Sequence, residues 1–243
     1  MMRDEFRSLA NRDESQYFFI DHLDEIGERH VAWIDIMGVL DRLRHNQTYP
    51  AVARGELFSV VSEHIAESQA QVTTVGDGVI ILTEDREYLV DFLDALMLHY
   101  ARFNVTNWRD DEDIWLLRLP RVGVGSGDIH KIDTEYYSED NLRGNVFHDD
   151  FRNEPFGPGM IRAMESERGA PFSIHESARH GDPQPIRWWE NINLEEEPRI
   201  DTVKMLKEYF DWYDSHYRYD YSPYSAGHYE ATLDYFDVDE SQL

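Results

Sequence analysis

Two aspartates follow β-branched runs that are typical of strands, and both could bind metal. Asp35 comes directly after "VAWI", and Asp77 stands at the tip of "VTTVGDGVII". The two residues are 42 positions apart, which leaves room for two neighbouring strands with a helix between them. If those strands pair, both carboxylates reach the same end of one sheet. Carboxylate oxygens suit Mg²⁺ or Mn²⁺, and two such ions would activate an attacking hydroxyl and neutralise a triphosphate.

Simpler interpretations of the same residues remain open. Asp77 lies in Gly76-Asp77-Gly78, a sequence that is also typical of a tight hairpin turn. Asp35 could instead be a polar cap at the end of its strand. The run "FHDD" at 147–150 is a weaker metal candidate in a polar loop, and His175 fits a strand residue better than a ligand.

The backbone after Asp35 offers donors for phosphate. The amides of Met37 and Gly38 precede a predicted helix, and N–H groups at such a position can hold phosphate oxygens. The chain has no glycine-rich Walker loop and no nucleophile elbow, so other common phosphate and acyl-transfer sites are not indicated.

The periodicity of apolar residues predicts the elements that must position these side chains. Residues 30–40 begin as a predicted buried strand and end in a glycine break, and residues 72–81 predict a strand hairpin. Residues 50–70 and 87–103 predict helices, with apolar positions that include Val52, Leu57 and Val60 on the first. Further predicted elements are a strand in 114–129 ended by Gly125 and Gly127, a helix at 160–170 and a strand at 171–175. This order predicts a mixed α/β sandwich with helices on one face of the sheet.

The chain divides into three predicted parts. Residues 1–29 are a polar lead-in, 30–186 form the main domain, and 187–243 form a mostly helical C-terminal extension. Residues 209–236 of the extension are rich in Tyr, Phe and Trp, with acidic neighbours. A platform for stacking nucleic acid bases would carry basic neighbours instead, so packing against the domain or a partner chain is expected.

Charge limits the possible partners. Asp and Glu number 49 against 23 Lys and Arg, and three of the basic residues are lysines. A formal net charge of −26 repels nucleic acid and anionic lipid, so neither is expected as a partner. An acidic, lysine-poor composition is typical of halophilic proteins. The alternative is an ordinary acidic protein with a disordered tail, but 41% hydrophobic and 13% aromatic residues argue against disorder. With no cysteine, no apolar membrane span and a polar N-terminus, the sequence predicts a cytoplasmic protein without disulfides.

Four segments together resemble the catalytic domain of class III nucleotidyl cyclases. They occur in that family's order within residues 30–176 and are "WIDIMG", "TVGDGVII", "RVGVGSGDI" and "FGPGMIRAMESE". The longer segment "FGPGMIRAMESERGAPFSI" is most similar to the pyrimidine cyclases of Pycsar antiphage defence. The resemblance implies a class III cyclase-like mixed sheet with a central hairpin, flanking helices and a C-terminal helical extension.

The resemblance also implies functional roles. Asp35 and Asp77 would hold two Mg²⁺ or Mn²⁺ ions, with the carbonyl of Ile36 beside them. The enzyme would be a homodimer with active sites at the chain interface. It would convert UTP or CTP to cUMP or cCMP and pyrophosphate, and the product would act on an effector in antiviral signalling. Predicted substrate contacts are Met37, Gly38, Thr73, Glu154 and Arg162.

Several positions depart from the family's pattern. Thr73 stands where purine cyclases carry a base-reading lysine, and Glu154 stands near their second base contact. Ile161 and Glu165 occupy the places of the Asn and Arg that stabilise the transition state, and losing one such donor typically costs ~10²–10³ in rate. Arg121 and Arg143 are possible replacements. A non-catalytic nucleotide-binding or sensor protein of this fold, or a purine cyclase, is therefore the alternative.

Overall fold

The computed structural model describes nine stretches of the chain, with gaps between them. They are residues 23–37, 48–66, 68–76, 78–107, 117–132, 155–167, 169–178, 181–216 and 226–243. The strands are β1 (Leu23–Ile36), β2 (Ala70–Val75), β3 (Gly78–Thr83), β4 (Pro120–Ile132), β5 (Ile174–Glu176) and β6 (Gln184–Ile186). The helices are α3 (Thr48–His64), α4 (Arg86–Asn107), α6 (Pro158–Ser166), α7 (Trp188–Asn191), α8 (Glu196–His216) and α9 (Ala226–Phe236), followed by a 3₁₀ turn, η4 (Glu240–Gln242).

The strands form a mixed six-stranded sheet in the order β2-β3-β1-β4-β5-β6. Only β4 and β5 run parallel in this sheet, and the other neighbouring strands are antiparallel. The β2–β3 hairpin predicted from the sequence is present, with Val75 paired to Gly78. The predicted fold class, a mixed α/β fold with flanking helices, is confirmed.

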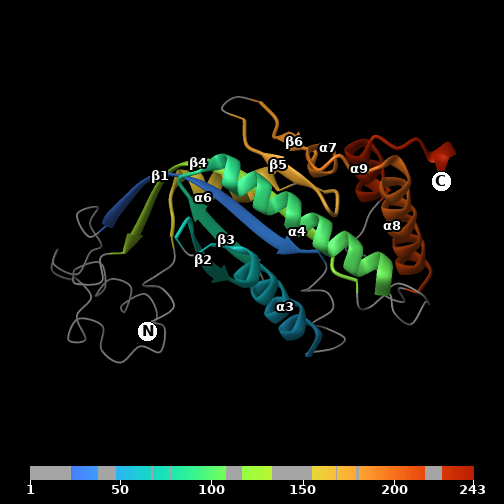
Figure 1. The fold of residues 1–243 in the computed structure, drawn as a ribbon, viewed down its shortest axis with the longest axis horizontal. Helices are drawn as coiled ribbons and strands as arrows, with labels where there is room; N and C mark the ends of the chain where they lie inside the picture. Colours follow the sequence, from blue (N-terminus) through green and yellow to red (C-terminus); the bar gives the residue numbers. More distant parts are fainter. Residues whose placement is uncertain are drawn as a thin grey trace, which may run out of the picture.

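The two faces of the sheet have different cores. Ala32, Ile34 and Ile36 of β1 are buried in a large cluster with side chains of α3, α4, α8 and α9. Val31 and Trp33 belong to a smaller cluster on the opposite face, with Ala163 of α6. Figure 1 shows α3 and α4 crossing the sheet, with α8 and α9 gathered toward the C-terminus. The prediction that helices cover one face is therefore wrong, because α6 covers the other.

Glycines in β4 let α6 lie directly on the strand. A Cβ on Gly123 would be 1.9 Å from the carbonyl oxygen of Ala163, and one on Gly125 would be 2.5 Å from that of Gly159. The Ser166 hydroxyl also donates to the Val124 carbonyl oxygen over 3.0 Å. Residues 120–132 form one continuous strand, so the prediction that Gly125 and Gly127 end it is wrong. These glycines permit close packing rather than a break.

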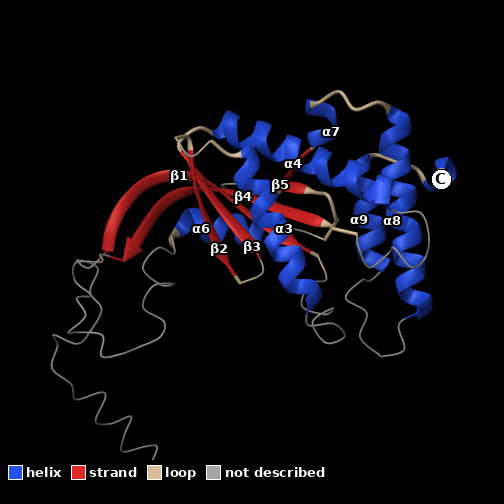
Figure 2. Ribbon diagram, turned by 60° about the horizontal axis from the view of Figure 1, so that its bottom comes forward, coloured by secondary structure: helices blue, strands red, loops and turns tan. Residues whose placement is uncertain are grey.

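The strand β1 begins at Leu23, seven residues before the start expected from the apolar pattern. Its first half pairs with the end of β4, and β3 joins only from His30 onward. The two strands therefore project beyond the sheet as a curved two-stranded ribbon (Figure 2). An exposed ribbon needs few buried apolar residues, which is why hydrophobic alternation alone does not predict it.

The two long predicted helices on the larger core are confirmed. The Asp85 carboxylate caps α4 by accepting hydrogen bonds from the amides of Glu87 and Tyr88. The helix α3 ends at His64, and Ala70 already belongs to β2. Val52 was expected on the buried face of α3 but is 51% exposed, while Ala53 is fully buried. The rest of the predicted stripe is confirmed, since Leu57, Val60 and Val61 are buried.

The C-terminal helices pack onto the main domain, as the aromatic pattern predicted. Tyr209, Phe210, Tyr235 and Phe236 are all buried in the large core cluster. The Tyr235 hydroxyl donates to the Ile186 carbonyl and accepts from the Ile174 amide, so it links β6 and β5. Burial raises the pKa of Tyr235, which keeps this hydroxyl protonated. No helix in the described ranges has both the length and the apolar character needed to cross a bilayer.

We predict that Gly123→Ala destabilises the protein by about 3 kcal/mol, because the new methyl group overlaps the backbone of α6. The matched control is Gly55→Ala in α3, where an added Cβ meets nothing within 4 Å. Alanine at that helical position should stabilise by ~0.5–1 kcal/mol. Urea unfolding of both variants measures the difference. A Gly123→Ala protein as stable as the wild type would contradict this packing.

Candidate functional site

Asp35 lies at the end of β1, on the sheet face that α6 covers. It pairs across the sheet with Arg121 of β4, and a nitrogen of that guanidinium, Nη2, lies 2.8 Å from the Asp35 Oδ2 atom. The two side chains are 15% and 20% exposed, so solvent reaches them from one side. A charge-assisted hydrogen bond of this kind is stronger than a neutral one and holds the carboxylate in one orientation.

A second carboxylate shares the same guanidinium. The Oε1 atom of Glu167, just after α6, is also 2.8 Å from Nη2 of Arg121. The other oxygen of Glu167 accepts a hydrogen bond from the indole nitrogen of Trp33 over 3.0 Å. We call Trp33, Asp35, Arg121 and Glu167 the Asp35 cluster. Its formal charge is −1, since one guanidinium faces two carboxylates.

The backbone after Asp35 is partly committed to the sheet. Ile36 and Met37 are buried, and the Met37 amide donates to the Leu119 carbonyl oxygen over 2.9 Å. A phosphate oxygen could reach the Met37 amide only by displacing Leu119. Gly38, predicted as a second phosphate contact, lies outside the described residues.

The carbonyl of Ile36 faces away from β4. Alternate residues of an antiparallel strand direct their backbone groups to opposite neighbours, and Met37 bonds to β4. The last pair between β1 and β3 in the described residues is Ile34 with Val79. The Ile36 carbonyl therefore lies beyond that pairing, next to the end of the hairpin.

The donors at this end of the sheet fit a hard divalent cation. The Asp35 carboxylate and the Ile36 carbonyl are oxygen ligands of the kind that Mg²⁺ and Mn²⁺ prefer. The second predicted ligand, Asp77, lies outside the described residues. Within the described ranges, no cluster of three or more His, Asp or Glu side chains could hold a metal ion. The described part of the chain thus supplies half of the predicted carboxylate pair.

The β2–β3 hairpin contacts the Asp35 cluster through the side chain of Trp33. A Cβ on Gly78 would lie 2.6 Å from the Trp33 ring, so the indole packs directly on the residue that follows Asp77 in sequence. Thr73 is opposite Ile80 on the hairpin, and Ile80 is opposite Trp33. Cross-strand neighbours share a face, so Thr73 lies on the same side of the sheet as Trp33.

Of the other predicted substrate contacts, the described Arg162 is not close to Asp35 within one chain. Arg162 donates from Nη1 to the Ser126 carbonyl over 2.6 Å, five residues along β4 from Arg121. At the rise of a strand, five residues correspond to roughly 16 Å. Ile161 and Glu165 are exposed on α6, and Glu154 lies outside the described residues. A site that combines the Arg162 side chain with Asp35 would therefore need a second chain, which remains a prediction.

Sequence reasoning missed the roles of Trp33 and Glu167. Both lie inside the quoted motifs, but neither has a typical catalytic spacing from Asp35. The signal that could have found Glu167 is the alternation of glycines at 123 and 125 in the predicted strand. Such spacing permits a helix to lie on the strand, and it brings the end of that helix near Arg121.

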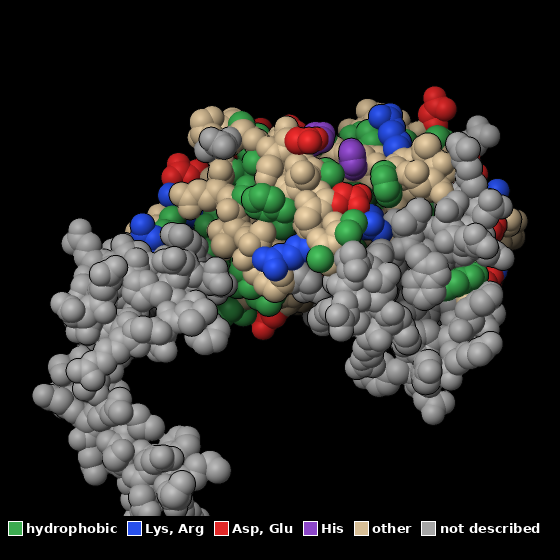
Figure 3. Space-filling model, turned by 90° about the horizontal axis from the view of Figure 1, so that it is seen from below, with side chains coloured by type: hydrophobic (Ala, Val, Ile, Leu, Met, Phe, Trp, Pro, Cys, Tyr) green, Lys and Arg blue, Asp and Glu red, His purple; other side chains and the backbone are tan. Residues whose placement is uncertain are grey.

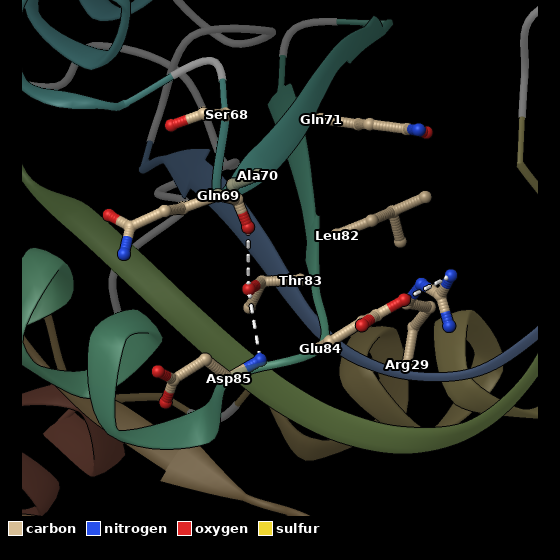
Figure 4. Close-up of a pocket in the computed structure, with 9 residues that line it drawn as sticks. All are labelled: Arg29, Ser68, Gln69, Ala70, Gln71, Leu82, Thr83, Glu84 and Asp85. Carbon is tan, nitrogen blue, oxygen red and sulfur yellow. Dashed lines mark hydrogen bonds and ion pairs between the residues drawn. The ribbon is translucent and has the colours of Figure 1, made fainter.

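A separate cavity of about 370 Å³ lies at the other end of the hairpin. Figure 4 shows its lining, where Arg29 and Glu84 form an ion pair of 2.7 Å. The Thr83 hydroxyl donates to the Gln69 carbonyl oxygen over 2.8 Å and accepts from the Asp85 amide. Because β2 runs from this cavity toward the hairpin tip, the cavity and Asp35 lie at opposite ends of the sheet.

Charged side chains on the described surface are mixed rather than segregated. Figure 3 shows one face, on which acidic groups are scattered among basic, apolar and polar ones. A protein that binds nucleic acid through its backbone presents a continuous basic patch. This face has no such patch among the described residues.

A groove of about 620 Å³ between α4 and α7 contains one buried carboxylate. Asp94 is 3% exposed, accepts a hydrogen bond from Asn191 over 2.9 Å, and has no partner for Oδ1 in the described residues. Burial raises the pKa of Asp94 from 3.8 to about 6, and the nearby charge of Asp91 adds to the shift.

We predict that Asp94 makes the fold less stable as the pH rises from 4 to 7. Because the folded-state pKa is raised, the stability contribution is complete below pH ~4 and is lost as the pH passes ~6. Relative to Asp94→Asn, the wild type should lose on the order of 2 kcal/mol across this range. Chemical unfolding at several pH values measures the difference. The control is Asp234→Asn on α9, where the carboxylate is exposed, and its unfolding free energy should change with pH as that of the wild type does. If the unfolding free energy of Asp94→Asn also changes with pH in parallel with the wild type, the assignment to Asp94 is wrong.

The comparisons with known proteins point to one kind of solved structure. No protein-family model matches the chain. No curated protein matches it either. A bacterial light-regulated adenylyl cyclase is similar, with 13% identity over 58% of this chain and a TM-score of 0.44. The catalytic core of a rhodopsin-guanylyl cyclase with converted specificity, in complex with ATPαS, has 12% identity over 77% of this chain and a TM-score of 0.46.

A third similar structure is an adenylate cyclase of Trypanosoma brucei in its monomeric state, with 16% identity over 71% of this chain and a TM-score of 0.41. The chain covers 77% of the trypanosomal structure and 85% of the rhodopsin-guanylyl cyclase core. It spans 39% of the length of the bacterial light-regulated enzyme. These three similar structures are thus adenylyl or guanylyl cyclases.

Proposed function

We propose that the protein is a metal-dependent nucleotide cyclase that converts UTP or CTP to a 3′,5′-cyclic nucleotide and pyrophosphate. Its product would serve antiviral signalling through a separate effector. The four sequence motifs support this function, and so does the Asp35 cluster. The observation that carries the proposal is the Asp35 carboxylate, which Arg121 holds at 2.8 Å at the end of β1.

The reaction needs little covalent chemistry from the protein. The ribose 3′-hydroxyl loses its proton to water and its oxygen attacks the α-phosphorus. The bond from that phosphorus to the bridging oxygen breaks, and pyrophosphate leaves with the bridging oxygen. Bound Mg²⁺ or Mn²⁺ would supply Lewis acidity for the attacking hydroxyl and for the phosphates. Asp35 and the Ile36 carbonyl would hold the ions together with Asp77. Positioning and charge stabilisation then account for most of the catalysis.

Arg121 supplies the positive charge nearest to Asp35 in the described residues. A guanidinium stays charged at neutral pH and offers several N–H donors in a plane, which suits phosphate oxygens. Arg121 is therefore the described residue best placed to orient a triphosphate beside Asp35. It cannot act as a general base, since it has no proton-accepting form at working pH.

The second half of the site is proposed to come from another copy of the chain. Ile161, Arg162 and Glu165 all present exposed side chains on α6, and Arg162 contacts Ser126, five residues along β4 from Arg121. A two-fold dimer would create two equivalent sites, each with Asp35 from one chain and α6 from the other. The exposed apolar side chains Ile161 and Met164, 56% and 44% accessible, would then be covered.

A non-catalytic nucleotide-binding protein is the second candidate. It is favoured by the same α6 surface, where Ile161 and Glu165 replace the amide and the cation expected from the family resemblance. An apolar group and a carboxylate cannot donate hydrogen bonds to a developing negative charge. Turnover separates the two candidates.

We predict that Asp35→Asn lowers turnover by at least ~10²-fold and weakens Mn²⁺ binding, because a neutral amide is a poor cation ligand. Arg121 keeps its contact with Glu167 in this variant, so the fold should remain intact. Pyrophosphate release, Mn²⁺ titration and thermal unfolding are the measurements. Asp182→Asn, an exposed carboxylate on the β5–β6 connection, should behave as the wild type. Full activity in Asp35→Asn would remove Asp35 from the mechanism.

We predict that UTP or CTP is cyclised in preference to ATP and GTP. Thr73 is too short and uncharged to reach a purine ring acceptor as a lysine would, whereas its hydroxyl can donate and accept at a pyrimidine edge. A site that hydrogen-bonds one base edge rejects a mismatch strongly. Incubation with all four nucleotides and Mn²⁺, at low and high salt, identifies the product. Dominant cAMP or cGMP would contradict the pyrimidine assignment, and binding without any cyclic product would favour the non-catalytic candidate.

A further inference from the structure

Glu167 joins three elements through one carboxylate. Oε1 lies 2.8 Å from Nη2 of Arg121 on β4, and Oε2 accepts from the indole nitrogen of Trp33 on β1 over 3.0 Å. The side chain is 15% exposed and follows directly after α6. Because each oxygen has a donor from a different strand, the carboxylate is fixed in both position and orientation.

Arg121 pairs with two carboxylates at once, and a cation bound at Asp35 would change the balance between these two ion pairs. The same nitrogen is 2.8 Å from Asp35 and 2.8 Å from Glu167, so the guanidinium stands between two carboxylates. A divalent cation on Asp35 would neutralise that carboxylate and repel the guanidinium. Glu167 is then the described carboxylate that still attracts Arg121.

We propose that Glu167 is a positioning residue, which retains Arg121 in the site when Asp35 binds a cation. This role rests on the proposed function, since it presumes a divalent ion at Asp35. Without the charge of Glu167, Arg121 pairs with Asp35 alone and competes with the cation for that carboxylate. Glu167 therefore acts through Arg121 and need not touch the substrate.

The contact with Trp33 extends this role to the hairpin. The Trp33 ring packs on Gly78, where a Cβ would lie 2.6 Å from the ring. Glu167 holds the other edge of the indole by its N–H group. The Glu167 carboxylate thus fixes both the Arg121 guanidinium beside Asp35 and the Trp33 ring that packs on the end of the hairpin.

The test is Glu167→Gln in the full-length protein, with Glu176→Gln as the matched control. Glutamine keeps the size and can still accept from Trp33, but it no longer pairs with Arg121 as an anion. Glu176 makes a comparable pair with Arg86, at 2.6 and 2.8 Å, on β5. We expect nucleotide-free Mn²⁺ affinity, measured by electron paramagnetic resonance, to fall about three- to tenfold in Glu167→Gln and to stay unchanged in Glu176→Gln.

A second readout does not depend on activity. The indole N–H resonance of Trp33, assigned with Trp33→Phe, should shift in Glu167→Gln and stay in place in Glu176→Gln. A shifted resonance with wild-type Mn²⁺ affinity would overturn the positioning role and leave the proposed function intact. A wild-type protein that binds no Mn²⁺ and forms no cyclic product would overturn the proposed function, and the positioning role with it.

A third variant covers the case in which Glu167→Gln does not fold. Glu167→Asp keeps the charge but is shorter by one methylene, so it cannot reach both Trp33 and Arg121. Its Mn²⁺ affinity should lie between those of the wild type and Glu167→Gln. If the glutamine variant is unfolded, the expected affinity of Glu167→Asp is about twofold below that of the wild type. Affinity equal to the wild type in the aspartate variant would contradict the need for both contacts.

Discussion

The close approach of α6 to β4 is the constraint on which the rest of the site depends. At Gly123 and Gly125 there is no room for a Cβ, because the backbone of α6 occupies that space. Helix and strand backbones are normally kept apart by side chains, so this contact restricts where the helix can lie. Ser166 adds a buried hydrogen bond to Val124 at the end of the helix. This packing places the next residue, Glu167, beside Arg121.

The contact between Glu167 and Arg121 completes a small network of ion pairs in a very acidic protein. The whole chain carries 49 acidic and 23 basic residues, and a buried or half-buried carboxylate needs a partner. Arg121 serves two of them at once. The result is an anionic unit at the end of the sheet, with an excess of one negative charge. In the proposed site, a cation at Asp35 would leave this guanidinium paired with Glu167.

The two faces of the sheet have different tasks. The face toward α3 and α4 buries a continuous apolar core, and the C-terminal helices extend that core with Tyr209, Tyr235 and Phe236. The face toward α6 has a smaller core and leaves room for the Asp35 cluster. Stability and candidate chemistry are thus separated across the sheet. Ile161 and Glu165 are exposed on α6, which packs on the face opposite the main core.

The sequence by itself was sufficient for the features that depend on local pattern. Two β-branched runs on either side of Gly76-Asp77-Gly78 predicted the hairpin, and the apolar periodicity of residues 87–103 predicted α4. The mixed fold class and the placement of Asp35 at a strand end followed from the same patterns. These signals are reliable because turns and amphipathic helices are determined by neighbouring residues.

Only the tertiary structure decided which distant residues share a site. Helices lie on both faces, β4 continues through Gly125, and β1 begins at Leu23, because long-range pairing and close packing outweigh local preference. The partnership of Asp35, Arg121 and Glu167 joins residues far apart in sequence, and nothing in their spacing determines it. It arises because the β4 glycines have no side chains, so α6 packs directly on the strand and brings Glu167 to Arg121.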